Sequence, residues 1–271
     1  MEGNWRAPKW RTGGQGKLRR FLLLAVIRSW ATTHDQTMQT SLPRPLILGH
    51  RGSPLEATEN TLRSFALARE EGADGVELDV RIAKDGTPVV IHDATLDRTT
   101  SAWGAVSEMA WPALQQMTGA QLPSLEQAAA WAAASSAWVN VEIKTAGAEQ
   151  SIVDIMRATG GLERVIFSSF DPLCVAALSS VAPDARRFLL LDAWDAEASK
   201  MVAQSGAQGV CLQVDAATPL NLEVIRNDDL PVIVWTVDDR PRMVEFLRMG
   251  IIGLITNRPA IGVSARAEAL G

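Results

Sequence analysis

From Leu46 onward, short apolar runs alternate with segments in which apolar residues recur at helical spacing. The apolar runs predict strands near residues 46–49, 75–80, 88–91, 138–143, 164–168, 187–191, 209–213, 232–236 and 252–255. The helical patterns lie near residues 60–71, 124–135, 147–159, 172–180, 195–204, 219–227 and 239–248. Such an alternation is typical of repeated β-α units around a parallel sheet.

These elements fit a (β/α)8 barrel over residues 44–260, which is compact for this fold. Eight strand-helix units result if the runs at 75–80 and 88–91 form one hairpin-like excursion. Residues 93–122 are then a loop or a short insertion after the second strand. A doubly wound open sheet is the alternative, but the glycine-rich dinucleotide motif of that fold does not follow the first strand. The sequence therefore predicts an α/β fold of the TIM-barrel type, with residues 261–271 as a C-terminal tail.

Residues 1–43 differ from the rest of the chain. Several basic residues precede the apolar run 21–27, as in a secretory signal peptide, but no clean cleavage site follows. The run is far shorter than the roughly 20 residues of a membrane span. We expect a disordered extension, or upstream sequence read from an earlier start than the cell uses, with Met38 as the alternative start. Arg19-Arg20 weakly resembles a twin-arginine signal, so export is the alternative to a cytoplasmic location.

Composition narrows the class of protein. A chain of 271 residues with 47% apolar and 21% charged residues has ample material for a globular core. Its net charge of −5 argues against a general nucleic-acid binder, which needs a basic surface. Cys174 and Cys211 both lie in apolar stretches, which predicts buried free thiols and favours a reducing compartment. The oligomeric state is left open.

Polar side chains occur where the predicted strands end, although the strands are otherwise apolar. They are His50, Arg51, Glu77, Asp79, His92, Glu142 and Lys144. The carboxyl ends of the strands of an α/β barrel meet at one rim, where such enzymes have their active sites. Residues two apart on a strand point to the same face, so Glu77 and Asp79 should point into one barrel mouth.

Three carboxylates in one mouth would repel one another unless a cation lay among them. Oxygen ligands of this kind suit Mg²⁺ or Ca²⁺, and two imidazoles beside them suit metal-assisted phosphoryl transfer. Each feature alone has an ordinary explanation, such as a hydrogen-bonded histidine or a solvated acidic pair. Charged residues within apolar strands are costly unless they are paired or metal-bound, however, and here they recur at several strand ends. The pattern predicts an enzyme with one divalent cation.

A series of short motifs marks these strand ends. In chain order they are His50-Arg51-Gly52, Glu59-Asn60-Thr61, Glu77-Leu78-Asp79-Val80, His92-Asp93 with Thr95-Leu96-Asp97-Arg98-Thr99-Thr100, Val141-Glu142-Ile143-Lys144 and Trp235-Thr236-Val237. The series closely resembles the glycerophosphodiester phosphodiesterase family, especially its small bacterial cytoplasmic members. The resemblance implies a TIM barrel that hydrolyses small molecules such as glycerophosphocholine and glycerophosphoethanolamine to sn-glycerol 3-phosphate and an alcohol.

The resemblance also implies roles for individual residues. His50 and His92 correspond to the catalytic pair, with His50 as general acid and His92 as general base. Glu77, Asp79 and Glu142 correspond to the ligands of the divalent cation.

Four further residues correspond to supporting positions of the family's site. Arg51 and Lys144 match cations that contact the phosphate and offset its developing charge. Trp235 matches an aromatic residue at the glycerol end of the pocket, although a core tryptophan is the alternative. Asn60 either supports the metal site or caps a helix.

Two positions depart from the family's usual pattern. Thr58 stands where proline usually precedes the Glu-Asn-Thr motif. Asn257 stands where the last strand usually ends on aspartate, which puts a supporting hydrogen bond or ion pair in question. None of the implied metal ligands is affected, so we expect an active enzyme.

Two other functions remain as alternatives. A phospholipase-type phosphodiesterase would act on intact phospholipids or lysophospholipids and would favour an apolar rim, for which the sequence offers only Trp103 and Trp111. A catalytically silent binding or scaffold barrel would have no reason to keep both histidines and all three carboxylates.

Overall fold

The computed structural model describes residues 42 and 44–271 of the chain. Apart from Leu42, the predicted N-terminal extension therefore lies outside the described residues, together with its apolar run, its alternative start and its export-like arginines. Among the described residues, no helix combines the length and the apolarity that a membrane span requires.

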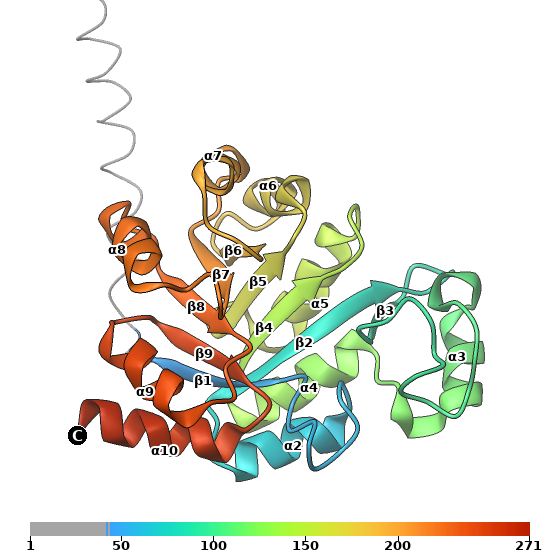
Figure 1. Ribbon diagram of the computed structural model, residues 1–271. Helices are drawn as coiled ribbons and strands as arrows, with labels where there is room; N and C mark the ends of the chain where they lie inside the picture. The colour runs from blue at the N-terminus through green and yellow to red at the C-terminus, as the bar shows by residue number, and fades with distance from the viewer. Residues whose placement is uncertain (1–41, 43) are drawn as a thin grey trace, which may run out of the picture. The chain divides into compact units, whose positions relative to one another are not determined.

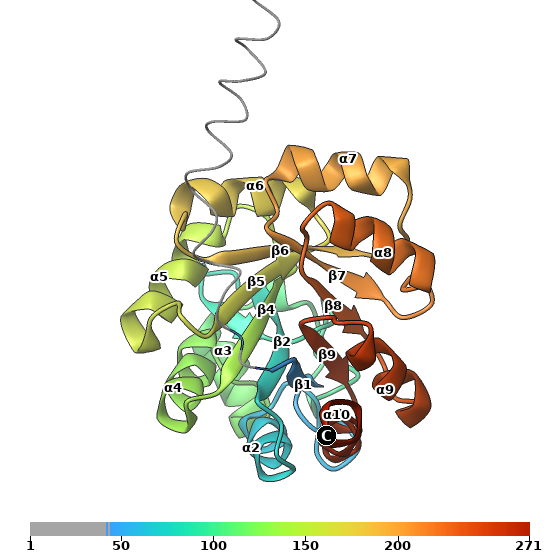
Figure 2. The same cartoon turned by 90° about the vertical axis from the view of Figure 1, so that its left-hand side faces the viewer.

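In the described part of the chain, eight parallel strands close into a barrel (Figures 1 and 2). The strands are β1 (Leu46–His50), β2 (Gly75–Ile82), β4 (Trp138–Ile143), β5 (Val165–Ser169), β6 (Arg186–Leu191), β7 (Gly209–Gln213), β8 (Val232–Trp235) and β9 (Gly253–Thr256). They pair in the order β1-β9-β8-β7-β6-β5-β4-β2, and a further pairing of β1 with β2 closes the barrel. The short β3 (Pro88–Val90) runs antiparallel to the end of β2. The predicted TIM barrel with a hairpin after the second strand is confirmed.

Helices cover the outside of the barrel, as Figure 2 shows. They are α2 (Leu62–Glu70), α4 (Leu125–Ser135), α5 (Glu149–Gly160), α6 (Pro172–Val181), α7 (Ala196–Ser205), α8 (Pro219–Asn227), α9 (Arg240–Arg248) and α10 (Pro259–Leu270). The first backbone N–H groups of a helix lack partners within it, so a polar side chain often caps them. Asp171, Thr218 and Asp239 do so for α6, α8 and α9, each with a proline in the first turn.

The last helix differs from the expectation of a C-terminal tail at residues 261–271. Those residues belong almost entirely to α10, which follows β9 and completes the eighth strand-helix unit. Small residues on its buried face weaken the apolar periodicity by which a helix is recognised in a sequence. A Cβ atom at Gly262 would lie 2.8 Å from Ile47, so the close approach of α10 to β1 requires glycine there.

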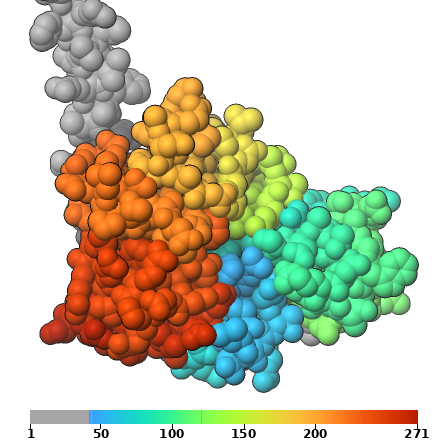
Figure 3. Space-filling model, viewed as in Figure 1, coloured from blue at the N-terminus to red at the C-terminus, as the bar shows by residue number. Residues whose placement is uncertain are grey.

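Residues 93–122 form an insertion beside the barrel (green in Figure 3). Its elements are η1 (Val106–Glu108), α3 (Trp111–Thr118) and η2 (Gly119–Gln121). The sequence predicts the insertion but not α3, which is short and has no side-chain cap at its start. Buried Leu96, Leu114 and Leu122 belong to a small apolar core of this region. The segment that follows His92 is therefore anchored by packing of its own.

Side chains alternate between the barrel interior and the surrounding helices. On β2, Val76, Leu78 and Val80 belong to the apolar core formed with the helices. Because successive strand residues point to opposite faces, Glu77 and Asp79 point into the barrel. This strand thus carries its two carboxylates on the enclosed side.

Both cysteines are buried and free, as the sequence predicts. Burial, followed by the charges of Glu142 and Glu77, raises the pKa of Cys211 well above its usual value. Burial raises the pKa of Cys174 to about 12. Both thiols therefore remain protonated at neutral pH and have little nucleophilic character.

Candidate active site

Three carboxylates from two neighbouring strands converge in the barrel mouth. The register of β2 and β4 places Asp79 beside Glu142, and Glu77 lies two residues before Asp79. Each residue offers an oxygen within 4.8 Å of the others, and their exposed fractions are 4%, 0% and 8% for Glu77, Asp79 and Glu142. The structure brings together the three residues that the sequence predicts as metal ligands.

The electrostatics of this cluster favour a bound cation. Burial, and then the charges of Asp79 and Glu142, raise the pKa of Glu77 well above its usual value. Burial and the charge of Asp79 likewise raise the pKa of Glu142 to about 7. Burial also opposes ionisation of Asp79, but the charges of Lys144 and Arg51 outweigh it and lower the pKa of Asp79. A divalent cation would stabilise all three charged carboxylates at once.

The two oxygens of Asp79 have different surroundings. Oδ2 accepts a hydrogen bond from Asn60 Nδ2 at 2.8 Å and lies 3.2 Å from Arg51 Nε. Oδ1 is buried and has an ion-pair contact with Lys144 Nζ at 3.0 Å, but accepts no well-aligned hydrogen bond in the described part of the chain. This oxygen is thus available to a metal ion, and the residues present fit a hard divalent cation.

Asn60 contacts Asp79 rather than capping α2. Its side-chain oxygen also accepts from the Asp79 backbone N–H at 3.3 Å. The cap of α2 is instead Thr61, whose hydroxyl accepts from the N–H of Ser64.

Arg51 and Lys144 follow β1 and β4 and lie next to the carboxylates. The Arg51 backbone N–H donates to Glu77 Oε2 at 3.0 Å. Lys144 Nζ lies 2.5 Å from Glu142 Oε1. Arg51 has a φ of 58°, a left-handed conformation that is uncommon for a residue with a side chain. The Ser64 hydroxyl donates to the backbone carbonyl of Arg51 at 3.0 Å, which helps to hold this conformation.

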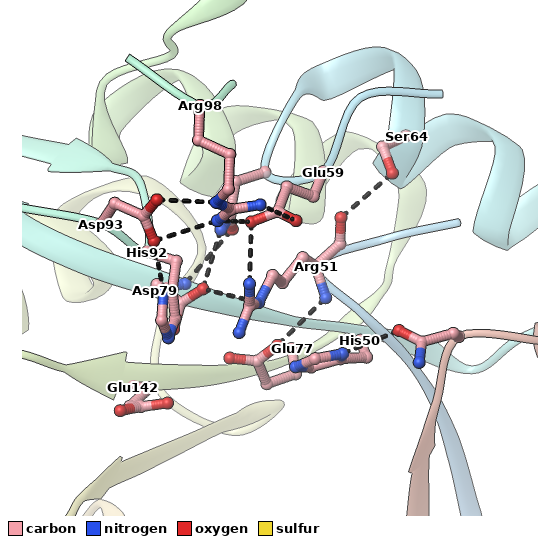
Figure 4. Close-up of polar contacts among 12 residues, drawn as sticks. His50, Arg51, Glu59, Ser64, Glu77, Asp79, His92, Asp93, Arg98 and Glu142 are labelled. Atoms are coloured by element: carbon pink, nitrogen blue, oxygen red, sulfur yellow. Dashed lines mark hydrogen bonds and ion pairs between the residues drawn. The ribbon is translucent and has the colours of Figure 1, made fainter. Parts of the chain in front are cut away.

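Both imidazoles are oriented by a partner at Nδ1 (Figure 4). His50 Nδ1 lies 2.8 Å from Asn257 Oδ1, and His92 Nδ1 lies 2.7 Å from Asp93 Oδ1. The partner oxygens only accept hydrogen bonds, so each Nδ1 carries a proton and each Nε2 is left for chemistry. Burial and the charge of Arg51 lower the pKa of His50.

A sequence model of the glycerophosphoryl diester phosphodiesterase family matches residues 50–261. The chain belongs to this family. A glycerophosphodiester phosphodiesterase of Caldanaerobacter subterraneus subsp. tengcongensis is 30% identical over 231 residues, which are 80% of this chain and 95% of that protein. One from Bacillus altitudinis is 28% identical over 240 residues, covering 82% of this chain and 98% of the other. The resemblance found in the motifs is confirmed.

Solved structures agree with this assignment. The glycerophosphodiester phosphodiesterase of Thermotoga maritima has a TM-score of 0.71 at 28% identity, covering 82% of this chain and 99% of its own. A phosphodiesterase of Oleispira antarctica, solved with its product sn-glycerol 3-phosphate, has a TM-score of 0.75 at 24% identity, covering 82% of this chain and 96% of its own. At that identity the second similarity concerns the fold.

Asn257, which replaces the family's usual aspartate, has a carboxylate behind it. Asp238 Oδ2 accepts from Asn257 Nδ2 at 2.6 Å, and Asp238 Oδ1 accepts from the Asn257 backbone N–H at 2.8 Å. The carboxylate of Asp238 thus fixes the side-chain amide of Asn257 so that the amide oxygen faces His50. The sequence reasoning missed Asp238, although it directly follows the Trp235-Thr236-Val237 motif.

Trp235 lies half-buried at the end of β8 rather than in the core. Its Nε1 donates to the Cys211 carbonyl at 2.9 Å. The rings of Trp235 and Phe170 form an edge-to-face pair with their centroids 5.6 Å apart. The ring is therefore fixed near the mouth of the barrel.

Apolar side chains are more exposed around this family member's barrel than the sequence suggests. Trp103 is 75% exposed, whereas Trp111 packs against the small core of the insertion. Leu55, Leu173 and Leu220 are also exposed and follow β1, β5 and β7.

Proposed function

We propose that this glycerophosphodiester phosphodiesterase family member hydrolyses glycerophosphodiesters to sn-glycerol 3-phosphate and an alcohol. Glycerophosphocholine and glycerophosphoethanolamine are the expected small-molecule substrates, and the cytoplasm is the proposed location. The observation that carries the proposal is the convergence of Glu77, Asp79 and Glu142, whose ligand oxygens lie within 4.8 Å of one another. Membership of the family supplies the substrate class.

In this proposal the three carboxylates hold one divalent cation, Mg²⁺ or Ca²⁺. Such a cation, when bound, polarises a phosphoryl oxygen and offsets charge that develops on it. The guanidinium of Arg51 and the ammonium of Lys144 would bind other phosphate oxygens and offset negative charge that develops on them in the transition state. Trp235 would contact the glycerol part of the substrate.

His50 and His92 would divide the proton transfers. We assign His92 Nε2 as the base that takes a proton from the attacking water and His50 Nε2 as the acid that protonates the leaving alcohol. Burial lowers the pKa of His50, which works against its role as an acid. The pH dependence of a variant with an altered residue 257, the partner of His50, distinguishes this assignment from its reverse.

Release of sn-glycerol 3-phosphate tests the function directly. A panel of headgroups should be assayed after EDTA treatment and after addition of Mg²⁺ or Ca²⁺. We expect activity on water-soluble diesters that is lost in EDTA and restored by one of these cations. Lipid vesicles belong in the same panel because of the exposed apolar residues, and a preference for them would replace the proposed substrate class with intact lipids.

A further inference from the structure

The guanidinium of Arg98, in the segment after β3, donates hydrogen bonds to the carboxylates of both Asp93 and Glu59 (Figure 4). Its Nε donates to Asp93 Oδ2 at 2.6 Å, and its Nη2 donates to Asp93 Oδ1 at 3.0 Å. On the other side, Nη1 and Nη2 donate to the two oxygens of Glu59 at 2.8 and 2.7 Å. Two-point contacts of this kind fix the relative orientation of the groups as well as their distance.

Each of these carboxylates contacts a residue to which the proposed function assigns chemistry. Asp93 Oδ1 accepts from His92 Nδ1 at 2.7 Å. Glu59 Oε1 accepts from Arg51 Nη1 at 2.8 Å. A continuous chain of charged contacts therefore runs from the imidazole of His92, through Arg98, to the guanidinium of Arg51.

The charges along this chain support one another. Hydrogen bonds from Arg98 and His92 hold the pKa of Asp93 well below its usual range. Burial of Glu59 favours its neutral form, but hydrogen bonds from Arg98 and Arg51 outweigh burial and lower its pKa. Both carboxylates are therefore ionised at neutral pH, as the two-point contacts require.

The segment that carries Arg98 is itself firmly held. Leu96 is fully buried, and its N–H donates to the Gly104 carbonyl at 3.0 Å. An isolated β-bridge joins Thr95 to Ala105. Ion pairs of partly exposed residues usually add little stability because their side chains are mobile. Here the backbone that carries Arg98 is fixed by packing. Arg98 therefore matters more for the orientation of Asp93 and Glu59 than for the stability of the fold.

We propose that Arg98 is a positioning residue that aligns His92 with Arg51, by holding Asp93 and Glu59 in one fork. The inference rests on the roles that the proposed function assigns to His92 and Arg51. Without Arg98, Asp93 is free to rotate, and His92 loses the partner that fixes its tautomer and its ring orientation. Misplacement of a reacting group by about 1 Å can cost about 100-fold in rate.

Kinetics of Arg98 variants test this alignment. Arg98→Met keeps an apolar stem and removes the fork, and should lower kcat on glycerophosphocholine by about 10- to 100-fold. Arg98→Lys keeps the charge but has no planar fork, so its kcat should lie between those of Arg98→Met and the unchanged protein. The matched control is Arg157→Met, which breaks a surface ion pair with Asp184 and should leave kcat unchanged. Melting temperatures close to that of the unchanged protein should accompany all three variants.

A spectroscopic readout tests the contact without relying on activity. The chain contains 3 histidines, so the ring nitrogens of protein labelled with ¹⁵N-histidine can be assigned by single His→Gln variants. Neutral His92 should be protonated at Nδ1 in the unchanged protein and should become a mixture of tautomers in Arg98→Met. A changed tautomer with unchanged kcat would overturn the catalytic role assigned to His92, whereas an unchanged tautomer would overturn the inference about Arg98 whether or not kcat falls.

A double-variant cycle separates a linked chain from independent effects. Glu59 also contacts Arg51 directly, at 2.8 Å, so the cycle is read from the tautomer of His92 rather than from kcat. If Glu59 acts on His92 through Arg98, Glu59→Gln should change the His92 tautomer when Arg98 is present and change it no further in Arg98→Met. An equal additional change in the Arg98→Met background would overturn the linkage. Should Arg98→Met not fold, Glu59→Gln and Arg98→Lys decide the question by the same kcat and tautomer measurements.

Discussion

Exchanging the amide of Asn257 with the carboxylate of Asp238 should change the pH dependence of activity and reveal the role of His50. In the double variant Asn257→Asp/Asp238→Asn, a carboxylate takes the place of the amide oxygen that lies 2.8 Å from His50 Nδ1. The 2.6 Å hydrogen bond between the two side chains can be kept with its direction reversed, because the new amide at position 238 can donate to the new carboxylate at position 257. The new amide can also still accept from the Thr256 hydroxyl, a bond of 3.0 Å. The exchange keeps the net charge and moves one negative charge toward the imidazole.

The expected size of the effect follows from this geometry. Burial and the charge of Arg51 lower the pKa of His50 in the unchanged protein. An opposite charge in close contact shifts a pKa by about 1 to 3 units toward the charged form. The pKa of His50 should therefore rise, which corresponds to about 1.4 to 4 kcal/mol in favour of the imidazolium. A general acid must carry its proton, so a raised pKa extends its working range to higher pH.

The assay is the pH profile of kcat, measured by release of sn-glycerol 3-phosphate between about pH 5 and 10. With His50 as the general acid, the alkaline limb of the profile should move to higher pH in the exchanged variant. Movement of the acidic limb instead would make His50 the general base and reverse the assignment.

Single variants provide the controls for the exchange. Asn257→Asp alone places two carboxylate oxygens where a donor and an acceptor now lie 2.6 Å apart, so it should behave worse than the exchange. Asp238→Asn alone keeps an amide beside His50 and should leave both limbs near their original positions. If neither limb moves in a folded exchanged variant, the reasoning that residue 257 controls a reacting imidazole is refuted.

Three further predictions concern the metal, the leaving group and the N-terminus. Glu77→Gln should abolish activity at low metal concentration and recover little at high concentration, because cation affinity depends on ligand charge; full activity of this variant in EDTA would contradict the metal site. The activity of His50→Ala on glycerophosphocholine should fall by roughly 10²- to 10⁴-fold relative to the unchanged protein. Its activity on an activated aryl phosphodiester, whose leaving group needs no proton, should fall much less. His92→Ala should have low activity on both substrates. Rescue of His92→Ala by the aryl substrate would exchange the two roles. Deletion of residues 1–37 should leave folding and activity intact, since no predicted site residue lies there, and loss of folded protein would show that this segment supports the barrel.

Strand periodicity and parallel topology were enough to predict where the carboxylates meet. Glu77 and Asp79 must share a face because they stand two apart on a strand. Glu142 joins them because the carboxyl ends of neighbouring parallel strands lie at one rim of the barrel. The order of the main elements was readable for the same reason, since each strand and most helices show their own repeat of apolar residues.

Two helices escaped the sequence because their patterns are weak. In α10 the close approach to β1 requires small residues such as Gly262, so the buried face is not marked by large apolar side chains. In α3 the helix is short and lacks a capping side chain. Tertiary contacts, rather than local preference, decide that these segments are helical.

By itself, the sequence determined the barrel, the family and the residues around the carboxylates, because these follow from local periodicity and from motifs at strand ends. Only the tertiary structure showed that Asn257 orients His50, that Asp238 orients Asn257, and that Arg98 joins Asp93 to Glu59. These contacts connect loops from different strands, and the path of a loop depends on packing that has no repeat along the chain. The partner of the His50 imidazole was therefore decided by the fold as a whole, whereas the partner of His92 is the next residue in the chain.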